Sequence, residues 1–166
     1  LVASMNPSPS GYFPDDPNNT SSTMEMQRYM NKLSGPLLDR IDIHIEVSKV
    51  EYEQLTEKKK GESSASIRAR VNRARDIQNA RYKDSDINYN AQMGSKEMEK
   101  HCELDEYSQL LIKAAMLKLN LSARAYSRIL KVARTIADLE DSANIQGDHI
   151  SEAIQYRSLD RDFWNV

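Results

Sequence analysis

After residue 63 the sequence repeats one local pattern, in which a side chain that can cap a helix stands before apolar residues at helical spacing. Ser63 or Ser64 precedes a helix that we expect to run to about Tyr82, and Asp105 and Ser122 precede the next two. The apolar faces of these helices are expected to hold Ile67, Val71, Ala74 and Ile77 or Gln78; then Tyr107, Leu110, Leu111, Ala114 and Leu117; then Tyr126, Ile129, Val132, Ala133, Ile136 and Ala137.

Three further local signals extend this helical region. A short helix is predicted over residues 95–101, and a last helix from Asp148 onward. Asn120 is expected to end the helix that follows Asp105 in a left-handed backbone conformation. The sequence therefore predicts a helical bundle over residues 63–161.

A smaller β portion is expected before residue 50. Over residues 41–47 apolar and polar side chains alternate, which is the period of a strand with one buried face. Residues 1–5 are typical of a short buried strand that ends at Asn6-Pro7, because proline cannot donate a ladder hydrogen bond. Two strands do not form a stable open sheet alone. We therefore expect the remaining strands upstream, and this chain to be a fragment of a longer protein.

The predicted fold class is mainly α with a small β portion. Between the two strands we expect a loop over residues 7–23, a helix over 24–33 and a single helical turn over 37–40. The predicted divisions of the chain are residues 1–50 as the end of an α/β core, 51–62 as a charged connector, 63–161 as a helical domain and 162–166 as a tail. The sequence indicates no role for Trp164 in that tail.

Composition excludes several classes of protein. No apolar run among the 166 residues is long enough for a transmembrane helix, and the chain opens without the features of a signal peptide. Cys102 is the only cysteine, which excludes an internal disulfide and favours a reducing compartment. We therefore expect a cytoplasmic protein with no membrane partner. The histidines His44, His101 and His149 are isolated from any ligand pattern, and no metal site is predicted.

Asn6 and Arg40 are two candidate functional residues in the first part of the chain. Asn6 follows a predicted strand, and in open α/β sheets ligands lie beyond the carboxyl ends of the strands. Its amide can orient a water or a phosphate oxygen, or it can simply begin a turn. Arg40 lies between Asp39 and Asp42 just before the second predicted strand. It can present a rigid, always charged fork to another subunit, or form a surface ion pair.

Arg124 is the third candidate, in the first turn of the helix capped by Ser122. The first turn of a helix carries unsatisfied N–H groups and partial positive charge, so an arginine there adds to a site that favours anions. It is locally unfavourable for the helix, which indicates a functional reason. Arg128 lies one turn later on the same face.

A basic run extends from Lys58 to Lys83, with nine basic residues against two acids. Its arginines fall on two flanks of the predicted helix: Arg70, Arg73 and Arg81 on one, and Arg68 and Arg75 on the other. Such a surface can follow a nucleic-acid backbone, and these five arginines are candidate DNA-binding residues. A solvated helix with ion pairs between subunits is the alternative that composition leaves open.

The sequence also resembles a known family. The resemblance is carried by the stretches Leu1-Val2-Ala3-Ser4-Met5-Asn6-Pro7, Leu33-Ser34-Gly35-Pro36-Leu37-Leu38-Asp39-Arg40-Ile41-Asp42, Gly61-Glu62-Ser63-Ser64, Tyr89-Asn90-Ala91-Gln92-Met93, Leu121-Ser122-Ala123-Arg124-Ala125-Tyr126, Arg134-Thr135-Ile136-Ala137-Asp138-Leu139 and residues 152–161. Together they resemble the magnesium-chelatase-like AAA+ ATPases of the ComM (YifB) type. The resemblance covers nearly the whole chain. It implies the end of an AAA+ α/β core, with two strands, followed by a helical lid.

The resemblance also implies roles for the candidate residues. Asn6 matches the sensor-1 residue that positions the attacking water, Arg40 the arginine finger that reaches ATP on a neighbouring subunit, and Arg124 the sensor-2 arginine of the lid. Arg128 is the substitute for Arg124 if the lid is rotated. ATP and Mg²⁺ are the cofactors implied for the full-length protein. Since no Gly-x-x-x-x-Gly-Lys-Ser/Thr pattern is present here, this chain is expected to bind neither alone and to be inactive alone.

Three functions follow as alternatives. The first is an ATP-driven ring, expected to be a hexamer, that remodels DNA or drives branch migration. The second is a chelatase-type motor that remodels a protein partner for metal insertion, and the third is a non-enzymatic helical interaction domain.

One departure from the family pattern concerns the loop after Asn6-Pro7, where family members often carry cysteines. Here Ser8, Ser10, Ser21 and Ser22 stand in that loop, and serine is a poor zinc ligand.

Overall fold

The computed structural model describes residues 1–32, 35–47, 50 and 61–157. The tail at 162–166, most of the connector and Lys58, which begins the basic run, lie outside these residues. The described residues divide into two compact units, residues 1–41 and residues 42–157.

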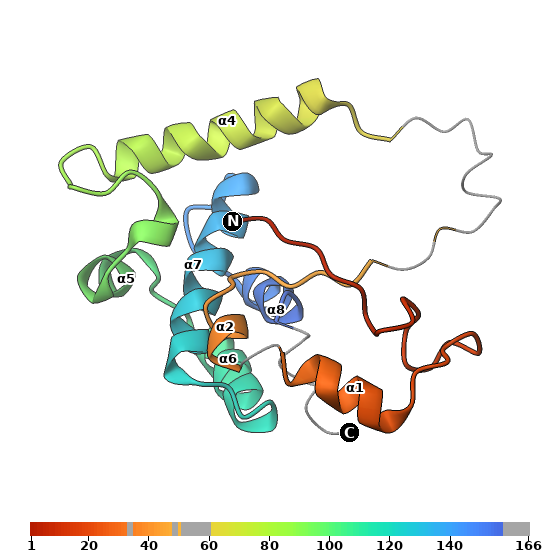
Figure 1. Ribbon diagram of the computed structural model, residues 1–166. Coiled ribbons are helices and arrows are strands. Elements are labelled where there is room, and N and C mark those ends of the chain that lie inside the picture. Colours follow the sequence, from red (N-terminus) through yellow and green to blue (C-terminus); the bar gives the residue numbers. More distant parts are fainter. Residues whose placement is uncertain (33–34, 48–49, 51–60, 158–166) are drawn as a thin grey trace. The chain divides into compact units, whose positions relative to one another are not determined.

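The second unit is helical. Its elements are α4 (Ser64–Arg81), the 3-10 helix η1 (Asn90–Gln92), α5 (Ser95–His101), α6 (Glu106–Lys118), α7 (Ala123–Leu139) and α8 (Gly147–Gln155). The helix α7 is central, because it packs against α4, η1, α5 and α8, while α6 packs against α8. Figure 1 shows α4 lying across the end of α7. The predicted helical bundle is thus confirmed.

The core of this unit gathers around small and β-branched side chains of α7. Ala125, Ile129, Ala133 and Ala137 are fully buried, and Ile150 of α8 is buried against the same cluster. The three alanines allow the neighbouring helices to approach α7 closely, while Ile129 fills the space between them.

Local capping signals placed the helix starts correctly. The side chains of Ser63, Asp105 and Ser122 accept hydrogen bonds from the backbone N–H groups three residues later, as N-cap residues do. Asn120 has a φ of 48°, the left-handed conformation expected at the end of α6. The predicted helix over 95–101 coincides with α5.

The first unit holds two helices, α1 (Thr23–Met30) and α2 (Gly35–Leu38). Ser22 and Glu25 form a capping box at the start of α1, which begins one residue before the predicted helix and ends three residues earlier. The turn α2 likewise begins two residues before the turn predicted over 37–40.

The predicted small β portion is wrong for the described residues, none of which forms a strand. A strand exists only where its backbone groups pair in a ladder with a second strand, and the backbone N–H of His44 donates instead to the carbonyl of Tyr156, just after α8. Leu1 and Val2 are fully exposed. The expected burial pattern over residues 41–47 is also wrong, since Ile43 and Ile45 are exposed and His44 is buried.

The apolar face predicted for α6 is another correction. Tyr107, Leu110 and Leu117 do share a face, but they are 65–77% exposed, and α6 instead buries Ser108 and Ile112. The helix is apolar on more than one side, so its sequence alone did not indicate which side faces the core. None of the helices in the described ranges is both long and apolar enough to cross a membrane.

The packing around α7 gives a first prediction. Replacing Ile129, which is fully buried, by alanine is expected to lower the free energy of unfolding by about 2–5 kcal/mol, because a cavity remains among packed helices. Urea denaturation of this chain, followed by circular dichroism, measures the change.

The matched control is Ile67→Ala on α4, where the same side chain is 42% exposed and the expected change is about 0.5 kcal/mol or less. Equal losses for the two variants would contradict the assignment of α7 as the centre of the core.

Candidate functional site

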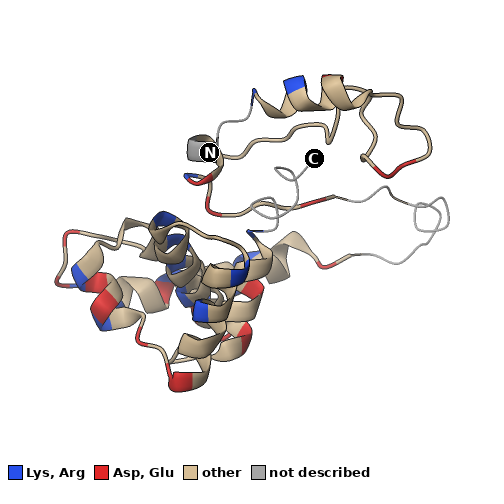
Figure 2. Ribbon diagram, turned by 90° about the horizontal axis from the view of Figure 1, so that it is seen from below, with Lys and Arg blue, Asp and Glu red and all other residues tan. Residues whose placement is uncertain are grey.

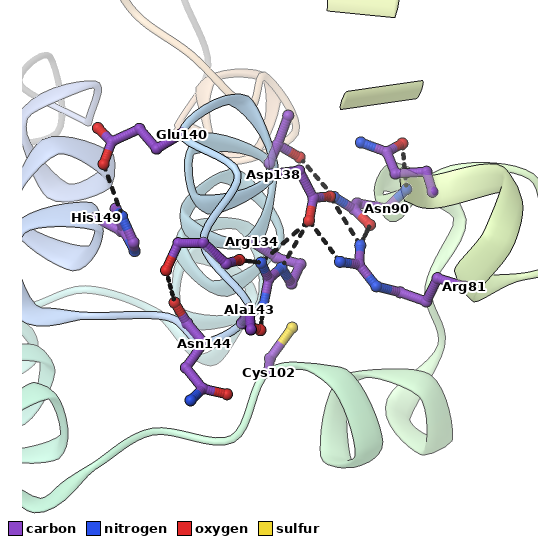
Figure 3. A network of polar contacts seen from close by, with 12 residues as sticks. Arg81, Asn90, Cys102, Arg134, Asp138, Glu140, Ala143, Asn144 and His149 are labelled. Atoms are coloured by element: carbon purple, nitrogen blue, oxygen red, sulfur yellow. Dashed lines mark hydrogen bonds and ion pairs between the residues drawn. The ribbon is translucent and has the colours of Figure 1, made fainter. Parts of the chain in front are cut away.

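A buried polar cluster of the second unit surrounds the carboxylate of Asp138, near the end of α7 (Figure 3). Arg81 of α4 donates two hydrogen bonds to it, with N···O distances of 2.7 and 2.5 Å. The Asn90 amide donates a third at 2.8 Å, and Arg134 Nε a fourth at 3.1 Å. Asp138 is buried, and these protein donors replace the water molecules that its carboxylate would bind if it were exposed.

The donors decide the charge of Asp138. Burial alone would raise the pKa of this carboxyl, but the hydrogen bonds from Arg81 and Asn90 and the nearby charge of Arg134 outweigh burial, and the pKa lies below its usual value. The hydrogen bond to Asp138 raises the pKa of Arg81. Burial lowers the pKa of Arg134, whose guanidinium also donates to the backbone carbonyls of Ser142 and Ala143. The cluster is therefore an ionised structural network.

This network separates Arg81 from the other candidate DNA-binding residues. Arg68, Arg70, Arg73 and Arg75 are exposed along α4, whereas the guanidinium of Arg81 is bound to Asp138. Arg70 forms an exposed ion pair with Glu62 at 2.9 Å, and the Arg75 guanidinium lies over the ring of Tyr89 at 5.0 Å. In Figure 2 basic and acidic residues are interspersed along the ribbon of the second unit.

The start of α7 carries the other arginines of interest. Ser122 caps this 17-residue helix, and Arg124 is exposed in its first turn, as predicted. Arg128, one turn later, donates to a carboxylate oxygen of Asp42 at 2.5 Å. The side chains of Arg128 and Asp42 are 28% and 42% exposed. Hence Arg128 is engaged in an ion pair.

Asn6 and Arg40 lie in the first unit, and the structure describes them there. The backbone carbonyl of Asn6 accepts a hydrogen bond from the hydroxyl of Tyr29 at 2.8 Å, which fastens the segment to α1, and the side chain is exposed. The backbone N–H of Arg40 donates to the carbonyl of Leu37 at the end of α2, and its side chain is exposed.

The loop that departs from the family pattern is held by hydroxyl groups. Ser8 Oγ and Ser10 Oγ lie 2.9 Å apart, and Ser10 donates to the amide oxygen of Asn19 at 2.7 Å. Ser21 Oγ accepts from the backbone N–H of Ser10 at 3.1 Å, while its own N–H donates to the same Asn19 oxygen. Two of the four serines at this loop, Ser10 and Ser21, therefore bind the same amide oxygen, and Ser8 is joined to them through Ser10.

Cys102 and His149 also take structural positions in the second unit. Burial raises the pKa of the Cys102 thiol to about 11, so the thiol stays protonated in the core. His149 accepts at Nδ1 from the Gln146 N–H at the start of α8, and its Nε2 lies 3.1 Å from Glu140. Among the described residues, no group of three histidine, cysteine or acidic side chains is arranged to hold a metal ion.

Sequence reasoning missed Asp138 and Asn90. Both stand in stretches that resemble the family, and Arg134 and Asp138 are four residues apart on one helix, which is the spacing of an ion pair. The partner Arg81 is 57 residues away, which no local pattern indicates.

Comparison with known proteins gives one consistent result. Residues 61–157 match the family described as magnesium chelatase, subunit ChlI C-terminal, and residues 1–55 match magnesium chelatase, subunit ChlI. The chain is 44% identical over 162 residues to the competence protein ComM of Haemophilus influenzae, and 40% identical over 162 residues to the uncharacterized protein YifB of Escherichia coli. These alignments cover 97% of this chain but 31% of each relative.

The Asp138 network gives a second prediction. Asp138→Asn leaves the guanidinium groups of Arg81 and Arg134 without their carboxylate, and is expected to lower the free energy of unfolding at pH 7 by about 3–5 kcal/mol. Because the pKa of Asp138 is lowered by folding, its stabilising contribution is complete above about pH 4, its ordinary pKa, and is lost as the pH falls through the lower folded value.

Urea denaturation of this chain between pH 2 and pH 7 measures both effects. Stability of the variant is expected to fall less steeply below about pH 4 than that of the parent chain, because the group that must be protonated is gone. Asp76→Asn, at an exposed position of α4, is the matched control and is expected to change stability by about 0.5 kcal/mol or less. A parallel pH dependence in parent and Asp138→Asn chains would contradict the assignment.

Proposed function

Since this chain belongs to the family of magnesium chelatase subunit ChlI, we propose that it is the C-terminal part of an AAA+ ATPase, with the helical unit acting as the lid over a nucleotide. The chain spans 31% of the length of the relatives it matches, so the ATPase activity belongs to the longer protein. The observation that carries the proposal is the exposed Arg124 in the first turn of α7, a long buried helix whose N-terminus favours an anion.

The proposed roles follow from the charge and position of three side chains. Arg124 binds the phosphates of ATP on its own subunit, and Arg40 reaches the ATP of a neighbouring subunit. The amide of Asn6 orients the attacking water. ATP with Mg²⁺ supplies the phosphoryl group when it is bound in the full-length protein, and the two guanidinium groups stabilise the negative charge that develops during transfer.

We further propose that the full-length ring, a hexamer, couples this hydrolysis to the remodelling of DNA, including branch migration. Four exposed arginines on α4 support a contact with the phosphate backbone: Arg68, Arg70, Arg73 and Arg75. Arg81 is not part of this surface, because its guanidinium is bound to Asp138. One relative carries the name competence protein, which agrees with a role in handling DNA.

A second candidate is a chelatase-type motor that remodels a protein partner, and one observation favours it. The face of α6 formed by Tyr107, Leu110 and Leu117 is apolar and exposed, which is the character of a surface that contacts protein. The family description, magnesium chelatase, points to the same candidate. A non-enzymatic interaction domain would use this face as well, so the assays below are chosen to separate hydrolysis, DNA binding and structure.

The third prediction tests the arginine roles in the full-length protein. Arg40→Ala is expected to reduce the ATP turnover number by about 10³-fold or more while ATP binding is kept, because an arginine finger acts on the transition state in the neighbouring site. Arg124→Ala is expected to weaken ATP binding itself. Steady-state phosphate release and titration with a fluorescent ATP analogue measure the two quantities.

The matched control is Arg28→Ala, which removes an exposed arginine of α1 and is expected to change neither quantity. Wild-type turnover in the Arg40→Ala protein would remove the arginine-finger assignment and indicate that a different residue serves as the finger.

The fourth prediction tests DNA binding by its salt dependence. Replacing the four exposed arginines of α4 by glutamine is expected to reduce the slope of log K against log salt by about 0.9 for each arginine that contacts a phosphate. Fluorescence anisotropy of labelled duplex DNA with the full-length protein measures the slope between low and physiological salt.

The matched control replaces four exposed lysines on other helices, Lys96, Lys100, Lys113 and Lys118, by glutamine. An equal reduction of the salt slope in both variants would show that DNA binding depends only on the net charge of the protein. An unchanged slope in the arginine variant would exclude α4 as the DNA contact.

A further inference from the structure

The second unit begins at Asp42, two residues after Arg40, and this entry point is fastened to the helical bundle. Asp42 accepts a hydrogen bond from Arg128 of α7 at 2.5 Å. Two residues later, the backbone N–H of His44 donates to the carbonyl of Tyr156, just after α8, at 2.7 Å. The polypeptide that follows Arg40 is therefore held at two points, once by an ion pair and once by the backbone.

The ion pair lies close to the proposed lid arginine. Arg128 and Arg124 are four residues apart on α7, so they lie on one face of the helix, one turn from each other. Lys131, the next cation along α7, also interacts electrostatically with the carboxylate of Asp42. Asp42 thus faces two positive charges on the helix that carries Arg124, and any shift of α7 at this end acts directly on Asp42.

We propose that the Asp42–Arg128 ion pair couples the two nucleotide sites that each subunit serves. This inference rests on the proposed function, in which Arg124 binds the subunit's own ATP and Arg40 acts on the ATP of the neighbour. When ATP draws Arg124 and the start of α7 into place, Arg128 moves with them and positions Asp42 and, through two peptide units, Arg40. Asp42 and Arg128 are positioning residues, because they act through Arg40 and Arg124.

The exposure of the pair suits a contact that forms and breaks. Both side chains reach solvent, at 28% and 42% exposure, so either charge can be hydrated when the pair opens. The Asp138 cluster differs, because it is buried and its separation would leave charges away from water. The coupling must also be reciprocal for binding: engagement of Arg40 with the neighbour would tighten the subunit's own hold on ATP.

The experiment uses full-length rings assembled from mixtures of active and inactive subunits. Subunits carrying Arg124→Ala are mixed in increasing fraction with otherwise unchanged subunits, and ATP turnover is measured without DNA. If each site controls the finger that serves its neighbour, turnover falls faster than in proportion to the fraction of Arg124→Ala subunits. When every subunit also carries Asp42→Asn, turnover is expected to fall in simple proportion, because defective sites no longer affect their neighbours.

Two further variants separate coupling from a structural role. The exchange of charges in Asp42→Arg with Arg128→Asp is expected to restore the steeper fall. Glu62→Gln, which removes the carboxylate of the exposed Glu62–Arg70 ion pair, is the matched control and is expected to leave the steep curve unchanged. If Asp42→Asn abolishes turnover by itself, the charge exchange must restore both turnover and the steep curve, and its failure would overturn the proposal.

The outcomes distinguish this inference from the proposed function. Full turnover in rings made only of Arg40→Ala or only of Arg124→Ala subunits would overturn the proposed ATPase roles. Those rings can instead be impaired while turnover falls along the same mixing curve whether the subunits carry Asp42 or Asp42→Asn. In that case the ATPase roles stand and the coupling through Asp42 is overturned. Proportional loss in the unchanged rings would also overturn the coupling.

Discussion

The position of α4 depends on one buried carboxylate. α4 buries only Ala74 and Gln78, and its first ten residues are all exposed, so its apolar contact with the bundle is small for an 18-residue helix. The hydrogen bonds and ion pairs of Asp138 provide the attachment of α4 that this small apolar contact does not provide. It binds Arg81 of α4 and Asn90 of η1 from a place on the central helix, and it is held there by Arg134. Since each hydrogen bond to Asp138 requires its own direction, the network fixes the angle of α4 to α7 as well as the distance between the two helices.

This arrangement divides the arginines of the chain by environment. Arg81 and Arg134 are bound to a buried carboxylate, Arg128 is paired with a half-exposed one, and Arg68 and Arg73 are exposed on α4. A sequence reports all of them as equal positive charges. Only the partner and the exposure separate an arginine that holds the fold from one that is accessible to a phosphate. The candidate DNA surface is thus smaller than the basic run in the sequence.

What the sequence predicted correctly was local, and what it did not predict depends on distant partners. Caps at Ser63 and Ser122 need only the three following residues, so the helix starts were confirmed. A strand needs a second strand, so the alternation over residues 41–47 was not sufficient, and His44 took the buried position. In the candidate site, the place of Arg124 in the first turn of α7 followed from the cap at Ser122. The engagement of Arg81 and Arg128 depends on residues 57 and 86 positions away.

The serine loop shows how the segment carrying Asn6 is ordered in this chain. A metal bound by thiolates would order a loop in one cooperative step, but serine is a poor metal ligand. In this chain Ser10 and Ser21 both bind the amide oxygen of Asn19, Ser8 bonds to Ser10, and the hydroxyl of Tyr29 separately binds the carbonyl of Asn6. Each hydrogen bond contributes only about 1 kcal/mol, so the stability of the loop is the sum of several small contributions, and single bonds can break without the others. The backbone of Asn6 is therefore fastened to α1 through Tyr29, and the loop after it is ordered by hydrogen bonds of serine and asparagine side chains, none of which depends on a bound metal or on redox state.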